Sequence, residues 1–152
     1  MILIHVKRRK HLLAAIIAVA ILLLSMLLLL WGCGKKTDAP INGGDAAARV
    51  AYLEGLGWQV SSQEVETLHL KLPEKLEGSW GDYAALQDAQ GLPFAQFAGK
   101  TVERYTYTVT NYPGRAEDVQ INLYLSDGAI IGGDLITLGE GGFRADLTFP
   151  KS

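Results

Sequence analysis

The side chains that could carry acid–base chemistry in this chain are one isolated histidine and several acidic pairs. His69 is the only histidine after residue 11, so it has no second imidazole to work with. Closely spaced carboxylates, which glycosidases use as acid and base, occur at Glu64/Glu66, Glu74/Glu77 and Glu117/Asp118. These pairs fall in predicted loops or at the ends of predicted elements, where charged side chains are normally solvated. They supply carboxylates without a recognisable catalytic arrangement.

The sequence offers no recognisable set of metal ligands and no motif of a catalytic nucleophile. Cys33 is the single cysteine, and His69 has no further cysteine or histidine nearby with which to assemble a zinc site. None of the GxSxG, HExxH or P-loop spacings occurs. We therefore expect no metal and no cofactor. Whether the protein is an enzyme stays open, with a non-enzymatic role favoured.

The element that carries His69 is predicted to be a strand over residues 66–72. Leu68, Leu70 and Leu72 alternate with polar residues, so the leucines share one face and His69 lies on the other. We expect a solvated surface histidine rather than a catalytic base.

Residues 12–31 form an uninterrupted hydrophobic run with Ser25 as its only hydroxyl and no charge. At about 1.5 Å per residue, a helix of this length crosses a hydrocarbon core about 30 Å thick. Four basic residues (7–10) precede the run and two (Lys35 and Lys36) follow it, so the N-terminus is expected to stay in the cytoplasm. The sequence predicts a protein of the cell membrane, in contact with the lipid bilayer through residues 12–31 and with residues 34–152 outside the cytoplasm.

The manner of anchoring has alternatives. Leu30-Trp31-Gly32-Cys33 resembles the lipobox of bacterial lipoproteins, in which the cysteine is lipidated and becomes the new N-terminus. Trp31 stands where a smaller residue is usual, and the run is long for a cleaved signal, whose apolar region is typically about 7–15 residues. An uncleaved single-pass signal anchor, lipidation at Cys33 and simple secretion therefore stay open. All three place the following domain outside.

The predicted organisation is a basic cytoplasmic N-terminus (1–11), a membrane helix (12–31), a flexible tether (32–44) and one domain (45–152). From Lys35 onward, ten basic and sixteen acidic residues give a net charge of −6, which argues against a nucleic-acid partner. Candidate partners are an envelope protein or an envelope polysaccharide.

The first element of this domain is a predicted helix from Asp45 to Leu56. Asp45 is a suitable N-cap, and Gly57 is placed to end the helix. A second, short helix is predicted to begin at an Asp82 cap and to stop at Gly91.

Residues 101–149 alternate between apolar and polar side chains over four successive stretches, which is typical of an antiparallel meander. Asp127-Gly128 is a strong signal for a two-residue hairpin turn. The apolar face of such a sheet must be covered, most simply by the helix over 45–56. The expected fold class is α+β, with an antiparallel sheet of about five strands covered on one face by a helix.

The polar side chains of the meander would lie on the sheet face away from the core. Hydroxyls and amides there could bind peptides or wall polysaccharide, but threonine and tyrosine are also ordinary strand residues. We expect a membrane-anchored extracytoplasmic binding or interaction module, with an exported hydrolase using an unrecognised acidic site as the alternative. The members of the predicted binding face are Arg104, Thr106, Thr108, Thr110, Gln120, Asn122 and Tyr124.

Asp134 is the acid whose place in the alternation is contradictory. A turn at 127–128 with an unbroken ladder would pair Asp134 with Ile121 and put a carboxylate in the core. An unpaired buried carboxylate costs several kcal/mol or takes up a proton. We favour a bulge at Gly132-Gly133, which would turn Asp134 outward. The alternative, an inward Asp134 with a raised pKa, would be a candidate catalytic or switching acid.

Three stretches together resemble a known family: YLEGLGWQV (52–60), FAGKTVERYTYTVTNYPGR (97–115) and INLYLSDGAIIGGDL (121–135). The family is the domain of unknown function 4830 of Firmicutes, which follows an N-terminal hydrophobic segment. The resemblance covers about residues 46–150 and implies a small exported domain. It implies no activity, cofactor or catalytic residue, and Cys33 lies outside it.

Overall fold

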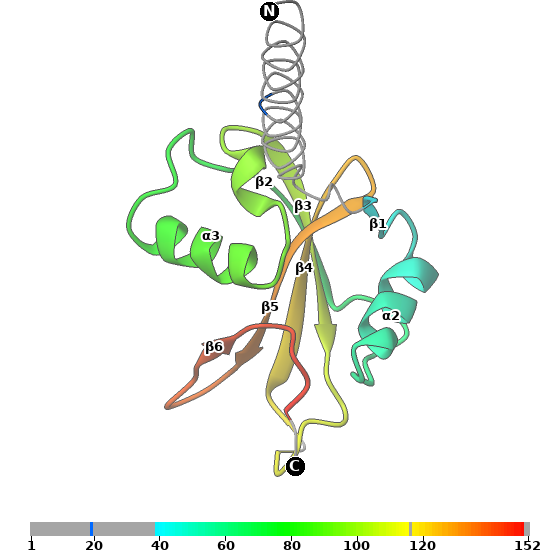
Figure 1. The fold of residues 1–152 in the computed structure, drawn as a ribbon. Helices are drawn as coiled ribbons and strands as arrows, with labels where there is room; N and C mark the ends of the chain where they lie inside the picture. The colour runs from blue at the N-terminus through cyan, green and yellow to red at the C-terminus, as the bar shows by residue number, and fades with distance from the viewer. Residues whose placement is uncertain (1–18, 20–38, 116, 151–152) are drawn as a thin grey trace, which may run out of the picture. The chain divides into compact units, whose positions relative to one another are not determined.

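An antiparallel sheet lies between two helices in the part of the chain that begins at Pro40 (Figure 1). The computed structural model describes residue 19 and residues 39–115 and 117–150. Cys33, the basic residues 7–10 and, apart from Val19, the hydrophobic run lie outside the described residues. Within the described part, no helix has both the length and the apolar character to cross a membrane.

Six strands of the described residues form one sheet in the spatial order β1-β5-β4-β3-β2, and β6 also pairs with β5. The strands are β1 (Ile41–Asn42), β2 (Glu66–Lys71), β3 (Thr101–Thr108), β4 (Val119–Ser126), β5 (Ala129–Thr137) and β6 (Arg144–Ala145). The helices are α2 (Ala46–Gly55), α3 (Ser79–Ala89) and a short 3-10 helix η1 (Phe94–Phe97). The predicted α+β class with an antiparallel sheet is confirmed. Because β1 pairs with β5, the domain takes up residues that the sequence assigns to the tether 32–44.

Helix α2 is closed at both ends by its own sequence. The carboxylate of the N-cap Asp45 accepts a hydrogen bond from the Ala48 N–H at 2.7 Å. At the other end Gly57 has φ +99°, and the N–H groups of Gly57 and Trp58 donate to carbonyls of the last turn. This Schellman arrangement turns Trp58 back onto Leu53 in the core. The predicted start and stop of this helix are confirmed.

The sheet face under α2 carries the larger of two buried apolar clusters, which includes Leu53, Trp58 and Leu147. Trp58 donates its indole Nε1–H to the Leu147 carbonyl at 2.8 Å. The Leu147 N–H in turn donates to Oε1 of Gln90, the C-cap residue directly after α3, at 2.8 Å. The backbone of Leu147 is therefore bonded to side chains that follow both helices.

The opposite face of the sheet is covered by α3, as Figure 1 shows. Tyr83 of α3 and Phe94 of η1 pack on Tyr124 of β4 in the second buried cluster. The rings of Tyr83 and Phe94 lie 4.9 Å apart at 71°, an edge-to-face contact. The expectation of a sheet covered on only one face is therefore wrong. The expected start of this helix is wrong as well, because α3 begins at Ser79 and Asp82 lies inside its first turn.

Strands β4 and β5 form a hairpin with the predicted two-residue turn. Asp127 and Gly128 have φ values of +51° and +75°, as a type I′ turn requires. The pairing then skips Ile131, because neighbouring residues of β4 pair with Ile130 and Gly132. Ile131 is thus the extra residue of a β-bulge. The predicted register shift is confirmed, directly before the glycine pair rather than within it.

Gly132 and Gly133 let other segments approach the bulged strand closely. A Cβ on Gly132 would lie 2.8 Å from a ring carbon of Phe94, and a Cβ on Gly133 would lie 2.6 Å from a methyl of Leu147. The Gln87 side chain of α3 reaches the same place, where its Oε1 accepts a hydrogen bond from the Gly133 N–H at 2.8 Å. A helix side chain therefore pairs with β5 at a point that neither β1 nor β6 reaches.

Gly133→Ala should lower the free energy of unfolding by about 1–3 kcal/mol, because the new methyl group overlaps Leu147 in a packed interior. Urea unfolding of the full chain in detergent micelles, followed by tryptophan fluorescence, measures this change. Gly55→Ala is the matched control, since nothing lies within 4 Å of a Cβ at that position. It should leave stability unchanged or raise it by up to about 1 kcal/mol. Wild-type stability in Gly133→Ala would contradict the close packing.

Candidate functional site

Asp134 lies beneath α3 rather than in solvent. The bulge places the Asp134 side chain on the sheet face opposite to that of Leu135, as predicted. This second face is not open to solvent, because α3 covers it. The side chain is only 1% exposed. The expectation of a solvated Asp134 is therefore wrong, although the register behind it is right. Alternation assigns a residue to a face but does not indicate what covers that face.

Both carboxylate oxygens of Asp134 are engaged by donors. Tyr83 of α3 donates its O–H to Oδ1 at 2.9 Å, and Arg144 of β6 donates its Nε–H to Oδ2 at 3.0 Å. Asn122, the cross-strand neighbour on β4, donates its amide to Oδ2 at 3.5 Å. The Asn122 carbonyl oxygen accepts from the Thr106 hydroxyl of β3 at 2.7 Å. The buried acid thus connects α3 and three strands.

Burial raises the pKa of Asp134 above its ordinary value, and this effect outweighs those of its partners. The hydrogen bond from Tyr83, the charge of Arg144 and the Asn122 amide all lower the pKa in opposition. The pKa of Tyr83 is also raised, first by burial and then by the charge of Asp134. Tyr83 therefore stays protonated and serves as a hydrogen-bond donor rather than a base.

Arg144 extends from this network to the edge of an open pocket. Its Nε is bonded to Asp134, its side chain is 54% exposed, and its Cζ lies 5.2 Å from the centre of the Tyr83 ring. The pocket has a volume of about 230 Å³ and is lined by Ser79, Trp80, Tyr83, Tyr124 and Arg144. Tyr124 alone among these belongs to the predicted binding face. The sequence carries one signal for the others, because Trp80 and Tyr83 are three residues apart and share a helix face.

The predicted binding face is largely covered. Thr106, Asn122 and Tyr124 are 3%, 4% and 6% exposed, so the expectation that they face solvent is wrong for these three. Their burial follows from the packing of α3 and η1 on this side of the sheet. The remaining members differ in exposure: Arg104, Thr108 and Gln120 are half-buried, and Thr110 is exposed.

A second buried polar network lies on the α2 side of the sheet and was not predicted. Arg49 of α2 is 4% exposed and donates to the Tyr107 hydroxyl at 2.8 Å and to the Gly43 carbonyl at 3.0 Å. Its Nη2 lies 3.5 Å from a carboxylate oxygen of Glu64, and its Cζ lies 3.7 Å from the centre of the Tyr105 ring. The guanidinium is enclosed by protein, so this arginine connects α2 to β3 rather than forming an open site.

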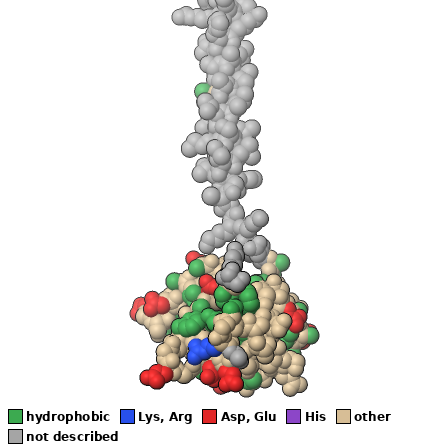
Figure 2. Space-filling view, turned by 90° about the horizontal axis from the view of Figure 1, so that it is seen from below, with side chains coloured by type: hydrophobic (Ala, Val, Ile, Leu, Met, Phe, Trp, Pro, Cys, Tyr) green, Lys and Arg blue, Asp and Glu red, His purple; other side chains and the backbone are tan. Residues whose placement is uncertain are grey.

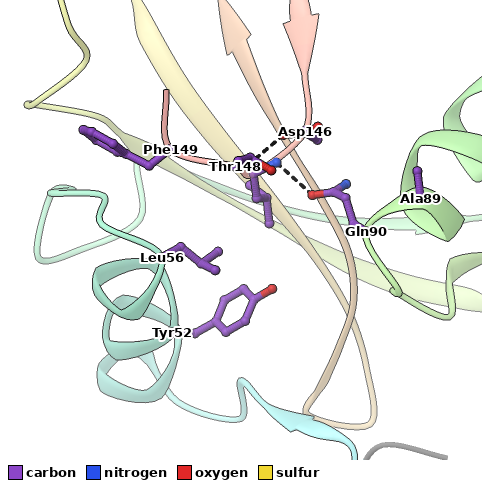
Figure 3. A pocket seen from close by; sticks show the side chains of 8 residues that line it. Tyr52, Leu56, Ala89, Gln90, Asp146, Thr148 and Phe149 are labelled. Carbon is purple, nitrogen blue, oxygen red and sulfur yellow. Dashed lines mark hydrogen bonds between the residues drawn. The ribbon is translucent and has the colours of Figure 1, made fainter. Parts of the chain in front are cut away.

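A larger pocket, with a volume of about 350 Å³, lies between α2, the end of α3 and the C-terminal segment (Figure 3). Tyr52 and Leu56 form the α2 side of this pocket. The Asp146 carboxylate at this pocket already accepts a hydrogen bond from the Thr148 N–H at 2.8 Å. Gln90 bonds the C-terminal segment and also a carbonyl of β5. This pocket is a gap between packed segments. A charged side chain with free hydrogen-bond donors, Arg144, lies instead at the smaller pocket.

His69 lies on the exposed side of β2, as predicted. Its side chain is 67% exposed, and Nδ1 lies 3.7 Å from a carboxylate oxygen of Glu103. Within the described residues, no three histidine, cysteine or acidic side chains are grouped to hold a metal ion. Cys33 lies outside the described residues and stays a predicted lipidation site.

The described residues define an α+β domain in which an antiparallel sheet separates two helices and a buried aspartate holds a surface arginine. The model of the family "Domain of unknown function (DUF4830)" matches residues 52–135, which is more than half of the chain. The chain belongs to this family, and the resemblance given by its sequence is confirmed. The match includes Asp134 and ends before Arg144. No curated protein and no solved structure matches the chain.

Asp134→Asn should change the pH dependence of stability. Because the folded-state pKa lies above the ordinary value of 3.8, the folded protein binds this proton more tightly than the unfolded chain. The contribution of Asp134 to the free energy of unfolding is therefore greatest near pH 3.8 and below, and it falls as the pH rises through the raised pKa.

Urea unfolding at a series of pH values measures this effect. The free energy of unfolding of the wild type minus that of Asp134→Asn should decrease from about pH 3.5 to about pH 7. Asp88→Asn removes an exposed carboxylate from α3, the helix that covers Asp134, and controls for the loss of one charge. A constant difference across this range would contradict burial as the dominant influence on Asp134.

Proposed function

We propose that this protein is a membrane-anchored domain that acts outside the cytoplasm as a binding or interaction module of the cell envelope. The support for this location comes from the sequence. Four basic residues precede the apolar run 12–31 and two follow it, which favours export of the C-terminal part. Either an uncleaved anchor or a lipid on Cys33 would hold the domain at the extracytoplasmic face of the cell membrane.

The observation that carries the binding role is the Arg144 pocket. The buried carboxylate of Asp134 holds one side of the guanidinium, while the side chain remains 54% exposed beside the half-buried indole of Trp80. Ligand sites typically combine apolar walls with a few polar groups in fixed positions. This pocket has both features.

The exported-hydrolase alternative would need an acid that reaches a substrate. A general acid or base must come within hydrogen-bonding distance of the reacting group. Asp134 is 1% exposed, and its oxygens already accept hydrogen bonds from Tyr83 and Arg144. Asp134 is thus suited to positioning an arginine, and binding is favoured over hydrolysis.

The surface also offers apolar contact area for a macromolecular partner. Figure 2 shows hydrophobic side chains gathered on one face of the domain, with acidic side chains toward its edge. Apolar surface of this kind is common at interaction sites. The large hydrophobic side chains that are 36–54% exposed in the domain include Leu56, Val65, Leu68, Leu138 and Phe143.

Cross-linking in intact cells, followed by purification of the full chain, tests the binding role. A binding module should return the same envelope component in independent preparations. A screen of the purified chain against wall substrates is the complementary measurement. Turnover in that screen, without a reproducible cross-linked component, would favour the hydrolase instead.

The topology predicts that protease added to intact protoplasts digests residues 34–152. The reason is the excess of basic residues before the apolar run 12–31. Immunoblotting with an antibody against the domain measures the loss of the full-length band. A cytoplasmic protein probed in the same sample controls for lysis. Complete protection of the domain in intact protoplasts would reverse the orientation.

Cys33→Ala distinguishes the two forms of anchoring. If Cys33 is lipidated, this variant should lose labelling by a fatty-acid probe and accumulate as a longer, unprocessed chain, because lipoprotein processing requires that cysteine. Mass spectrometry and membrane fractionation measure both effects. Ser25→Ala, within the same apolar segment, is the control. Unchanged mass and membrane retention in Cys33→Ala would establish the uncleaved anchor.

A further inference from the structure

Arg144 is held in a way that leaves most of its donors free. Its Nε–H donates to Oδ2 of Asp134 at 3.0 Å. Among the described residues, its two Nη groups have no hydrogen-bond or ion-pair partner. A guanidinium carries five N–H donors in a rigid fork that matches carboxylate and phosphate oxygens. An arginine fixed through Nε therefore presents its outer Nη groups as a preformed receptor for an anion.

The buried acid accounts for the fixed position of this arginine. A free arginine side chain loses about 2 kcal/mol of rotamer entropy when it is immobilised. The bond to Asp134, and the packing of the guanidinium over the Tyr83 ring at 5.2 Å, restrict Arg144 before any ligand arrives. Pre-organisation of this kind favours binding because less entropy is lost in the complex.

The wall beside Arg144 is a rigid aromatic surface. The Trp80 indole is stacked on Phe94 with ring centres 6.2 Å apart and planes at 11°, and it meets Tyr83 nearly at right angles. Trp80 is nevertheless only half-buried, so part of the ring borders the open pocket. A flat apolar surface suits the C–H face of a sugar ring, whose hydroxyl groups can remain in water.

A further polar side chain at the pocket also suits a sugar. Ser79, the first residue of α3, is exposed and lines the pocket, where its hydroxyl can exchange hydrogen bonds with a ligand hydroxyl. A volume of about 230 Å³ matches a ligand of single-ring size rather than an extended chain segment.

We propose that the pocket formed by Ser79, Trp80, Tyr83, Tyr124 and Arg144 binds one anionic sugar residue. The carboxylate or phosphate of the sugar accepts hydrogen bonds from the Nη groups of Arg144, and the sugar ring packs against Trp80. This inference rests on the proposed binding function and names its ligand class. Asp134 acts here as a positioning residue, since it acts through Arg144.

Isothermal titration of the full chain in detergent micelles tests the ligand class with matched sugars. N-acetylmuramic acid and N-acetylglucosamine differ by a carboxylate-bearing substituent, and N-acetylglucosamine 6-phosphate carries a phosphate instead. At least one acidic sugar should bind about tenfold or more tightly than the neutral sugar. The tighter of the two identifies the source of the anion. Equal binding of all three sugars, or no binding, would overturn the proposal.

Substitutions in the pocket test whether Arg144 and Trp80 bind the sugar. Arg144→Gln and Trp80→Leu should each weaken binding of the acidic sugar about tenfold or more, whereas Lys71→Gln removes one exposed positive charge elsewhere and should not. Arg144→Gln leaves Asp134 buried without its cation and could destabilise the fold. The double variant Asp134→Asn/Arg144→Gln removes both charges and should fold without binding the acidic sugar. Wild-type affinity in a folded double variant would overturn the role of Arg144.

The proposed function and this inference fail in different measurements. An outside domain with a reproducible cross-linked component but no affinity for acidic sugars would overturn the inference alone. A domain that protease cannot reach in protoplasts, yet binds acidic sugars through Arg144, would overturn the envelope location and keep the ligand class.

Discussion

Close backbone approach at Gly132 and Gly133 is the constraint on which both layers of this domain depend. No Cβ stands between β5 and the segments that pack on it, so Gln87 can replace a missing strand neighbour. The bulge at Ile131 lies directly before these glycines and sets the face that each following side chain takes. One local irregularity therefore determines both the packing of α3 and the position of Asp134.

Each helix is joined to the sheet by a buried network that contains an ion pair, and the two networks differ in one respect. Under α2 the charged centre is Arg49, whose guanidinium is enclosed by protein groups. Under α3 the charged centre is Asp134, and its partner Arg144 extends to the surface. Burying charges costs free energy that pairing recovers only in part. In the first network the arginine is enclosed and its partner Glu64 is 29% exposed, whereas in the second the carboxylate is enclosed and it is the arginine, at 54% exposed, that reaches solvent.

Local signals account for what the sequence predicts well, and tertiary coverage accounts for what it misses. The Asp45 cap and the Asp127-Gly128 turn depend on a few consecutive residues, so both are legible in the sequence. The covering of the second sheet face cannot be recognised in the sequence, because threonine, asparagine and tyrosine suit a solvated strand as well as a buried one. The inward residues of α3 include Gln87, which breaks any apolar stripe. Arg144 meets Asp134 only through the fold, from a strand of two residues.

The double attachment of Leu147 has a consequence for the order in which the domain forms. Its carbonyl accepts a hydrogen bond from Trp58, which follows α2, and its N–H donates to Gln90, which follows α3. Leu147 comes later in the chain than every described strand and helix. Because a polypeptide emerges from the ribosome N-terminus first, both helices are synthesised long before the residue that links them. A nascent chain that has not yet reached Leu147 lacks both of these hydrogen bonds, so the link between the two layers can form only when almost the whole domain has been made.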